Sequence, residues 1–122
     1  MAKILIIDDE QPIRRMLSTL FERNGYEVLT ASDGNKGLAA TREFNPDLII
    51  TDLLMPEKEG LETIKEIREI DTEVKIIAIS GGGVVQPEMY LKLAEKVGAD
   101  MSMTKPVDNA TLISSVKQLI DN

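Results

Sequence analysis

Three short apolar runs in the sequence predict the central strands of a sheet. Residues 4–7, 48–50 and 76–79 consist of Ile, Leu and Ala without a polar interruption. Unbroken apolar runs of this length are typical of parallel strands covered on both faces, whereas strands with one wet face alternate. Residues 26–30 alternate imperfectly and predict a more exposed strand, and residues 99–103 are a fifth candidate.

Helical periodicity occupies the segments between these strands. After the first strand, Pro12 suits the first turn of a helix and Gly25 would end it. Between them the apolar positions follow the i, i+3, i+4, i+7 spacing of one helix face: Ile13, Met16, Leu17, Leu20 and Phe21.

The same reasoning predicts four further helices, over residues 36–43, 61–70, 87–97 and 112–120. Asp108 or Asn109 would cap the last of them. Strand and helix therefore alternate five times, with no linker, repeat or low-complexity tract between them. This order predicts a single α/β domain over residues 1–122, with a parallel sheet and right-handed crossovers.

Composition narrows the classes of function. The chain has 122 residues, 43% of them hydrophobic and 29% charged, as expected for one globular domain. Its net charge of −7 makes nucleic acids and anionic membranes poor partners. With no Cys and no His, thiolate, disulfide and histidine chemistry are excluded. No apolar run approaches a signal or membrane segment, so we expect a soluble, cytoplasmic protein, and Met1 just before the first strand suggests a native start.

Polar residues follow the predicted strands in an unusual concentration. Asp8 and Asp9 follow the first strand, Asp52 the third and Ser80 the fourth, and Lys105 follows the fifth. Functional groups of open parallel sheets gather beyond the carboxyl ends of the strands, so we expect these side chains to converge. Three carboxylates at one edge would repel one another and raise their pKa values unless cations neutralise them. Mg²⁺ prefers such oxygen ligands, and Lys105 would add a fixed positive charge.

Each residue alone has a simpler interpretation. Asp8 and Asp9 could merely cap the first helix and complement its dipole. Asp52, which comes shortly before Pro56, could be a turn residue. A lone serine or lysine is usually structural. Only the joint occurrence of all five at strand ends favours a functional site.

These motifs resemble the receiver domains of bacterial response regulators over essentially the whole chain. The resemblance rests on the paired Asp8-Asp9, on the run from Asp52 to Pro56 with Gly60, on Ser80, and on Lys105-Pro106. It implies a flavodoxin-like (βα)₅ fold, a five-stranded parallel sheet with helices on both faces. It also implies two-component signalling, in which a phosphoryl group passes from the phosphohistidine of a sensor kinase, or of a phosphotransfer protein, to an aspartate.

The resemblance assigns roles by position. Asp52 would accept the phosphoryl group, and Mg²⁺ would be held by Asp8, Asp9, Asp52 and the backbone carbonyl of Leu54. Phosphoryl transfer to a carboxylate needs little beyond alignment and charge neutralisation, which agrees with this set.

Two further residues would act on the phosphoryl group. Lys105 would hold its oxygens, and the family's cis peptide would lie between Lys105 and Pro106. Ser80 would hydrogen-bond the new phosphate and draw its loop inward. We expect the chain to catalyse only its own phosphorylation and dephosphorylation, and to control an unidentified downstream protein or output domain.

Two positions depart from the family pattern. The family usually has an aromatic residue three positions before the lysine and often Phe after the proline, but Ser102 and Val107 stand here. Without a ring at position 102, another segment must report phosphorylation. The segment from Gly81 to Tyr90 is the candidate, because three glycines allow rearrangement and Tyr90 supplies an aromatic ring.

Three alternatives stay open. A haloacid-dehalogenase-type phosphatase also forms an aspartyl-phosphate, but Leu54 occupies the place of its second aspartate. A flavodoxin would need a Ser/Thr/Gly-rich phosphate loop where this chain has two carboxylates. A receiver domain excised from a longer regulator, with its output domain missing, would have the same sequence features.

Overall fold

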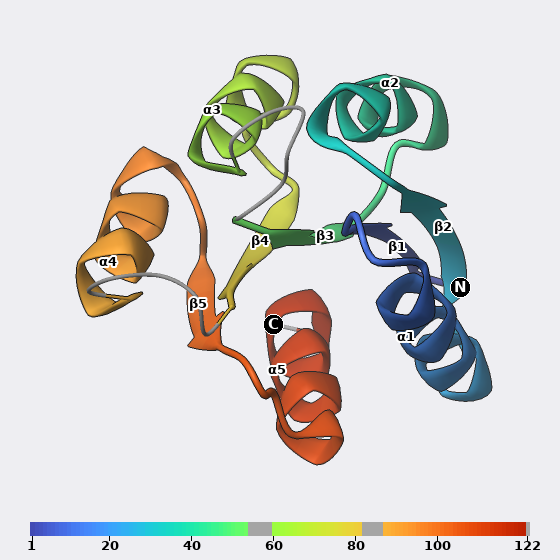
Figure 1. Cartoon of the computed structure of the whole chain (residues 1–122). Helices are drawn as coiled ribbons and strands as arrows, with labels where there is room; N and C mark the ends of the chain where they lie inside the picture. The colour runs from blue at the N-terminus through green and yellow to red at the C-terminus, as the bar shows by residue number, and fades with distance from the viewer. Residues whose placement is uncertain (54–59, 82–86, 122) are drawn as a thin grey trace.

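The computed structural model describes residues 1–53, 60–81 and 87–121, and strands and helices alternate through them as predicted. The elements are β1 (Lys3–Ile7), α1 (Gln11–Arg23), β2 (Glu27–Ala31), α2 (Gly34–Phe44), β3 (Leu48–Asp52), α3 (Gly60–Ile70), β4 (Lys75–Ser80), α4 (Pro87–Val97), β5 (Met101–Thr104) and α5 (Asn109–Asp121). Figure 1 shows the helices arranged around a single sheet. Within the described ranges, no helix is long and apolar enough to cross a membrane.

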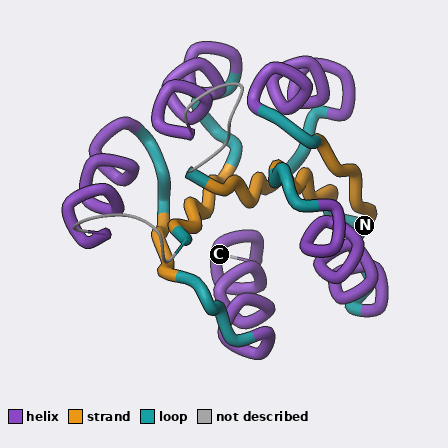
Figure 2. Tube along the Cα trace, in the orientation of Figure 1, coloured by secondary structure: helices purple, strands orange, loops and turns teal. Residues whose placement is uncertain are grey.

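The five strands form one parallel sheet in the order β2-β1-β3-β4-β5 (Figure 2). The chain moves outward from β1 to β2, returns past β1 to β3, and then continues outward in the other direction. Ligands of open α/β sheets bind where the winding reverses in this way, beyond the carboxyl ends of the strands. In this protein that point lies between β1 and β3.

Helices cover both faces of the sheet, which explains the unbroken apolar runs. In β1, Leu5 and Ile7 pack with residues of α2, α3 and α4, whereas Ile4 and Ile6 pack with residues of α1 and α5. All four side chains are fully buried. Figure 1 shows the same division, with α1 and α5 together on one side of the sheet. The predicted fold class is therefore confirmed.

Several element boundaries differ from the predicted ones, and local backbone contacts or turns explain three of them. The first helix turn of α2 begins two residues early, since the Asp33 carboxylate accepts the backbone N–H of Lys36 as a cap. The strand β2 begins one residue late, because the N–H of Tyr26 is donated to the carbonyl of Phe21 at the end of α1. The strand β5 begins two residues late, after Gly98 turns the chain with a φ of 136°. The predicted cap of α5 is Asp108, whose carboxylate accepts the N–H of Thr111.

A close backbone approach at Gly60 holds the start of α3 against the end of β3. The N–H of Gly60 is donated to the carbonyl of Leu53 at 3.0 Å. A Cβ at position 60 would lie 2.4 Å from the Cα of Leu53 and 2.7 Å from the carbonyl oxygen of Asp52. Since both neighbours are backbone atoms, only glycine fits here, and the approach fixes the chain directly after Asp52.

We expect Gly60→Ala to lower the free energy of unfolding by about 1–3 kcal/mol, the usual cost of overpacking a buried site. Urea unfolding measures this. The matched control is Gly81→Ala, because a Cβ at Gly81 would meet only the Cδ of Lys105, at 3.9 Å. Equal effects of the two substitutions would contradict the proposed constraint.

Candidate phosphoryl-acceptor site

The predicted polar residues do converge at the carboxyl edge of the sheet. Asp52 is the last residue of β3 and Ser80 the last of β4, while Asp8 directly follows β1. Oxygens of Asp8, Asp9 and Asp52 all lie within 4.8 Å of one another. Asp8 and Asp52 are buried, whereas Asp9 is exposed to solvent. The fold thus brings three carboxylates from two strands into one small cluster.

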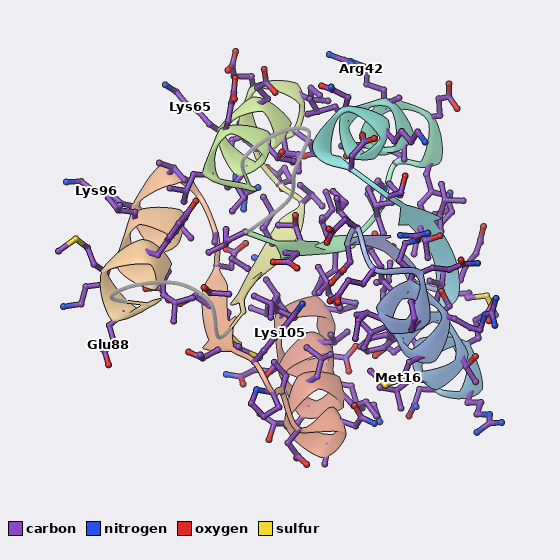
Figure 3. The ribbon with its side chains drawn as sticks, viewed as in Figure 1. Met16, Arg42, Lys65, Glu88, Lys96 and Lys105 are labelled. Carbon is purple, nitrogen blue, oxygen red and sulfur yellow. The ribbon has the colours of Figure 1, made fainter. Side chains whose placement is uncertain are left out.

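Lys105 reaches this cluster from the loop after β5. Its Nζ lies 3.0 Å from a carboxylate oxygen of Asp52, 3.5 Å from one of Asp8 and 3.6 Å from one of Glu10. Figure 3 shows the labelled lysine between α5 and the central strands. The peptide bond between Lys105 and Pro106 is cis, the form that the resemblance implies.

Backbone contacts hold both sides of the cluster. The N–H of Lys105 is donated to the carbonyl of Ser80 at 2.8 Å, so the ends of β4 and β5 stay together. On the other side, the guanidinium of Arg14 donates to the carbonyl of Asp8 at 2.8 Å. The Asp8 carboxylate accepts the N–H of Glu10 at 2.9 Å. These bonds attach the clustered side chains to backbone that the sheet already fixes.

The capping interpretation of Asp8 is wrong. The residue at the N-terminal cap of α1 is Glu10, whose side chain makes no capping hydrogen bond. The carboxylate of Asp8 accepts from the Glu10 N–H and from the Lys105 ammonium, and neither donor is an N–H of the helical turn that a cap would satisfy. Its burial at the sheet edge therefore has no explanation in helix capping.

Burial favours the neutral forms of Asp8 and Lys105, whereas the attraction between the two groups favours their charged forms. Burial raises the pKa of Asp8, and the charge of Asp52 raises it further, against the lowering effects of the Glu10 N–H and of Lys105. For Lys105, burial lowers the pKa, but the hydrogen bond and charge of Asp52 and the charges of Asp8 and Glu10 outweigh it and raise the pKa. The expected rise at Asp8 is thus present, with burial rather than repulsion as its main cause.

The donor set fits a hard divalent cation. Carboxylate oxygens are the ligands that Mg²⁺ prefers, and a buried anionic Asp8 gains most from a neutralising charge. The predicted fourth protein ligand, the carbonyl of Leu54, lies outside the described residues.

Ser80 offers a hydrogen-bond donor that the described part of the protein leaves unused. Its side chain is fully buried, and its Oγ has no partner among the described residues. Leaving a buried hydroxyl unsatisfied usually costs about 1–3 kcal/mol, so a bound anion at this place would recover that cost. This fits the predicted role toward a phosphoryl oxygen.

The predicted switch residues are placed less completely. Gly81 lies beside Lys105, and Tyr90 on α4 packs partly buried against the core. The residues between Gly81 and Pro87 lie outside the described ranges, so the role of this segment stays a prediction. Ser102, at the position of the usual aromatic ring, donates its hydroxyl to the Glu95 carboxylate on α4 at 2.6 Å.

Two residues of the site are not predicted by the sequence. The Glu10 carboxylate faces Lys105, and the Arg14 guanidinium donates to the carbonyl of Asp8. Both belong to the start of α1, where charged residues are ordinary. Their contacts depend on how α1 leaves the sheet, which the periodicity of the sequence does not specify.

An apolar pocket of about 430 Å³ opens beside the carboxylates, between α1 and α5. Its polar end is formed by Asp8, Asp52, Lys105 and Asn109. The remaining lining is apolar and comes from the sheet, from α1, from the loop after β5 and from α5: Ile6, Ile7, Ile13, Met16, Leu17, Ile50, Ile79, Pro106, Val107 and Leu112. In Figure 3, Met16 lies on α1.

Known proteins resemble this chain in sequence. The alkaline phosphatase synthesis transcriptional regulatory protein PhoP of Bacillus subtilis is 35% identical over 118 residues, covering 97% of this chain and 48% of that protein. The transcriptional regulatory protein CpxR homolog of Haemophilus influenzae is 34% identical, covering 98% of this chain and 51% of that protein. The chain therefore spans about half the length of these curated relatives.

Solved structures agree over nearly the full length. A response regulator receiver domain protein from Clostridium thermocellum superposes with a TM-score of 0.91 at 36% identity, covering 99% of this chain and 95% of that one. The Vibrio cholerae chemotaxis protein CheY4 does so with a TM-score of 0.86 at 31% identity, covering 98% of both chains. The family model for the response regulator receiver domain matches residues 4–117. With the acidic cluster and its lysine at the expected strand ends, this chain belongs to the receiver domain family of two-component response regulators.

Proposed function

We propose that Asp52 accepts a phosphoryl group in a Mg²⁺-dependent reaction and that this modification switches the domain. The observation that carries the proposal is the position of the Asp52 carboxylate. It is buried at the reversal point of the sheet, 3.0 Å from the Lys105 ammonium and within the cluster that includes Asp8 and Asp9.

The groups present account for the chemistry of such a transfer. A carboxylate oxygen of Asp52 would form the bond to phosphorus while the bond to the donor breaks. The leaving group is imidazole from a phosphohistidine, which takes up a proton, or acetate from acetyl phosphate. Lys105 and the Ser80 hydroxyl would bind phosphoryl oxygens. Mg²⁺, held by Asp8, Asp9 and Asp52, would supply charge neutralisation.

The wider role follows from the family. Receiver domains pair with histidine kinases and output domains, so the donor would be a phosphohistidine protein and the recipient of the signal a partner protein or domain. We also propose that the protein works in the cytoplasm and catalyses only its own phosphorylation and dephosphorylation. The relatives are transcriptional regulators by name, but the net charge of −7 disfavours direct binding of nucleic acid by this domain.

The apolar pocket between α1 and α5 is the surface that would receive the phosphohistidine protein. Its histidine must reach Asp52, so the donor has to cover the carboxyl edge of the sheet. The pocket opens onto Asp52 and is otherwise apolar, with the Met16 side chain 47% exposed at its margin. An amphipathic helix that carries the histidine fits a groove with this pattern.

Incubation with acetyl phosphate and Mg²⁺ should add one phosphoryl group to Asp52, which intact-mass and peptide mass spectrometry can locate. Asp52→Asn should abolish labelling, because the amide is not a nucleophile toward phosphorus. Lys105→Ala should slow labelling by about 10²-fold or more, as for the loss of a fixed charge at a developing anion. Full labelling of Asp52→Asn, or labelling after removal of divalent metal, would overturn the proposal.

Mg²⁺ should raise the thermal unfolding midpoint at neutral pH, by the equivalent of about 2.7 kcal/mol at a concentration 100 times its Kd. Because burial raises the pKa of Asp8, the folded protein loses stability as pH rises through that pKa. Asp8→Asn should therefore raise the midpoint at neutral pH and make it less sensitive to Mg²⁺. Near pH 4 the stabilising effects of Mg²⁺ and of the substitution should both become smaller, since the raised pKa keeps Asp8 largely protonated there.

Differential scanning calorimetry measures both effects. The control is Glu22→Gln, which removes one charge from an exposed position of α1 outside the cluster. A midpoint that ignores Mg²⁺ at neutral pH would argue against a shared metal site.

A histidine kinase that labels the parent chain should transfer its phosphoryl group at least about fivefold more slowly to Met16→Glu, as expected for loss of an interface anchor. Labelling by acetyl phosphate should be unchanged, since the small donor needs no docking surface. Met89→Glu on α4, also an exposed methionine, is the control. Equal loss with both donors would show that position 16 affects the site rather than docking.

A further inference from the structure

Three carboxylates surround the Lys105 ammonium, and one of them has no place in the proposed metal site. Asp52 and Asp8 belong to the cluster that would hold Mg²⁺, whereas Glu10 lies outside it. We propose that Glu10 is a positioning residue that holds Lys105 at the rim of the site and competes with the phosphoryl group for it. This inference rests on the proposed function and assigns Glu10 a role within it.

The fold fixes the backbone of Glu10 and leaves its side chain free for this task. The N–H of Glu10 is donated to the Asp8 carboxylate at 2.9 Å. Its carbonyl accepts the N–H groups of Ile13 and Arg14, each at 3.1 Å. The side chain makes no capping bond, although Glu10 occupies the cap position of α1. Its carboxylate instead lies 3.6 Å from the Nζ of Lys105.

The three contacts of Lys105 differ in what a loaded site would do to them. An ammonium group has three N–H donors, and here it has three anionic neighbours at 3.0, 3.5 and 3.6 Å. A divalent cation bound to Asp8 and Asp52 would offset their attraction for the lysine. Glu10 would then be the remaining uncompensated carboxylate beside it among the described residues. The attraction of that carboxylate would oppose any movement of Lys105 toward phosphoryl oxygens.

A second effect of Glu10 acts in the same direction. Its side chain is 59% exposed at the mouth of the site, so an incoming anionic donor meets its negative charge. Repulsion of the donor and retention of the lysine both raise the donor concentration needed for labelling. Neither changes the bonds made at Asp52 once the donor is in place. The expected signature is thus a change in half-saturation rather than in the maximal rate.

Glu10→Gln removes the charge and nearly preserves the shape. With acetyl phosphate and saturating Mg²⁺, its half-saturating donor concentration should fall about two- to fivefold, the range for losing an exposed ion pair, with the maximal rate unchanged. Glu22→Gln is the matched control. It lies twelve residues along α1, about 18 Å away, where its charge is screened at physiological salt.

A second readout follows the lysine itself, without phosphorylation. The Nζ and Cε resonances of Lys105 are assigned with Lys105→Arg and measured with Mg²⁺ bound. Relative to the parent protein, they should shift in Glu10→Gln and stay in place in Glu22→Gln. An unshifted lysine signal together with an unchanged half-saturation would overturn the inference. If the parent protein shows no labelling of Asp52, the proposed function fails, and the lysine signal still tests the contact with Glu10.

Discussion

The site depends on a single buried charge balance between Lys105 and the carboxylates at the carboxyl edge of the sheet. Asp8 and Asp52 lose most of their contact with water, which makes their anionic forms costly. The Lys105 ammonium offsets part of that cost at 3.0 and 3.5 Å. One lysine cannot neutralise three carboxylates, and the raised pKa of Asp8 shows the remaining cost of burial. The same imbalance would favour a bound cation over the free protein.

The sheet makes this arrangement possible by holding its members through main-chain contacts. The strand order brings the ends of β1 and β3 together at the reversal of the winding. The hydrogen bond from Lys105 to the carbonyl of Ser80 joins the lysine to the neighbouring strand end. Gly60 closes the other side by packing directly on the backbone after Asp52. Reactive side chains on such supports need little reorganisation when a phosphoryl group arrives.

The surroundings of the site divide into surfaces with different properties. On one side an apolar pocket between α1 and α5 leads to Asp52, and it suits a protein donor. At the rim, the exposed carboxylate of Glu10 faces Lys105. On the far side of β5, the hydroxyl of Ser102 joins the sheet to Glu95 on α4. A polar contact therefore links strand and helix at the position where the resemblance led us to expect a ring.

The fold class and most of the site could be predicted from the order of residues alone. Unbroken apolar runs identify strands buried on both faces, since a wet face would force alternation. Residues next to the ends of parallel strands must share one edge, so Asp8, Asp52 and Lys105 could be placed together without coordinates. The motif spacings then identified the family, which the comparisons confirm.

Contacts that depend on the angles between elements could not be predicted in this way. The ion pair of Glu10 with Lys105 joins residues far apart in the chain, and nothing in local periodicity specifies it. The boundaries of β2 and β5 moved because turn hydrogen bonds outcompete strand pairing for particular N–H groups. Burial, which dominates the ionisation of Asp8, is likewise a property of everything packed around a residue. Pattern along a chain specifies elements and their order, whereas the relative placement of side chains comes from packing.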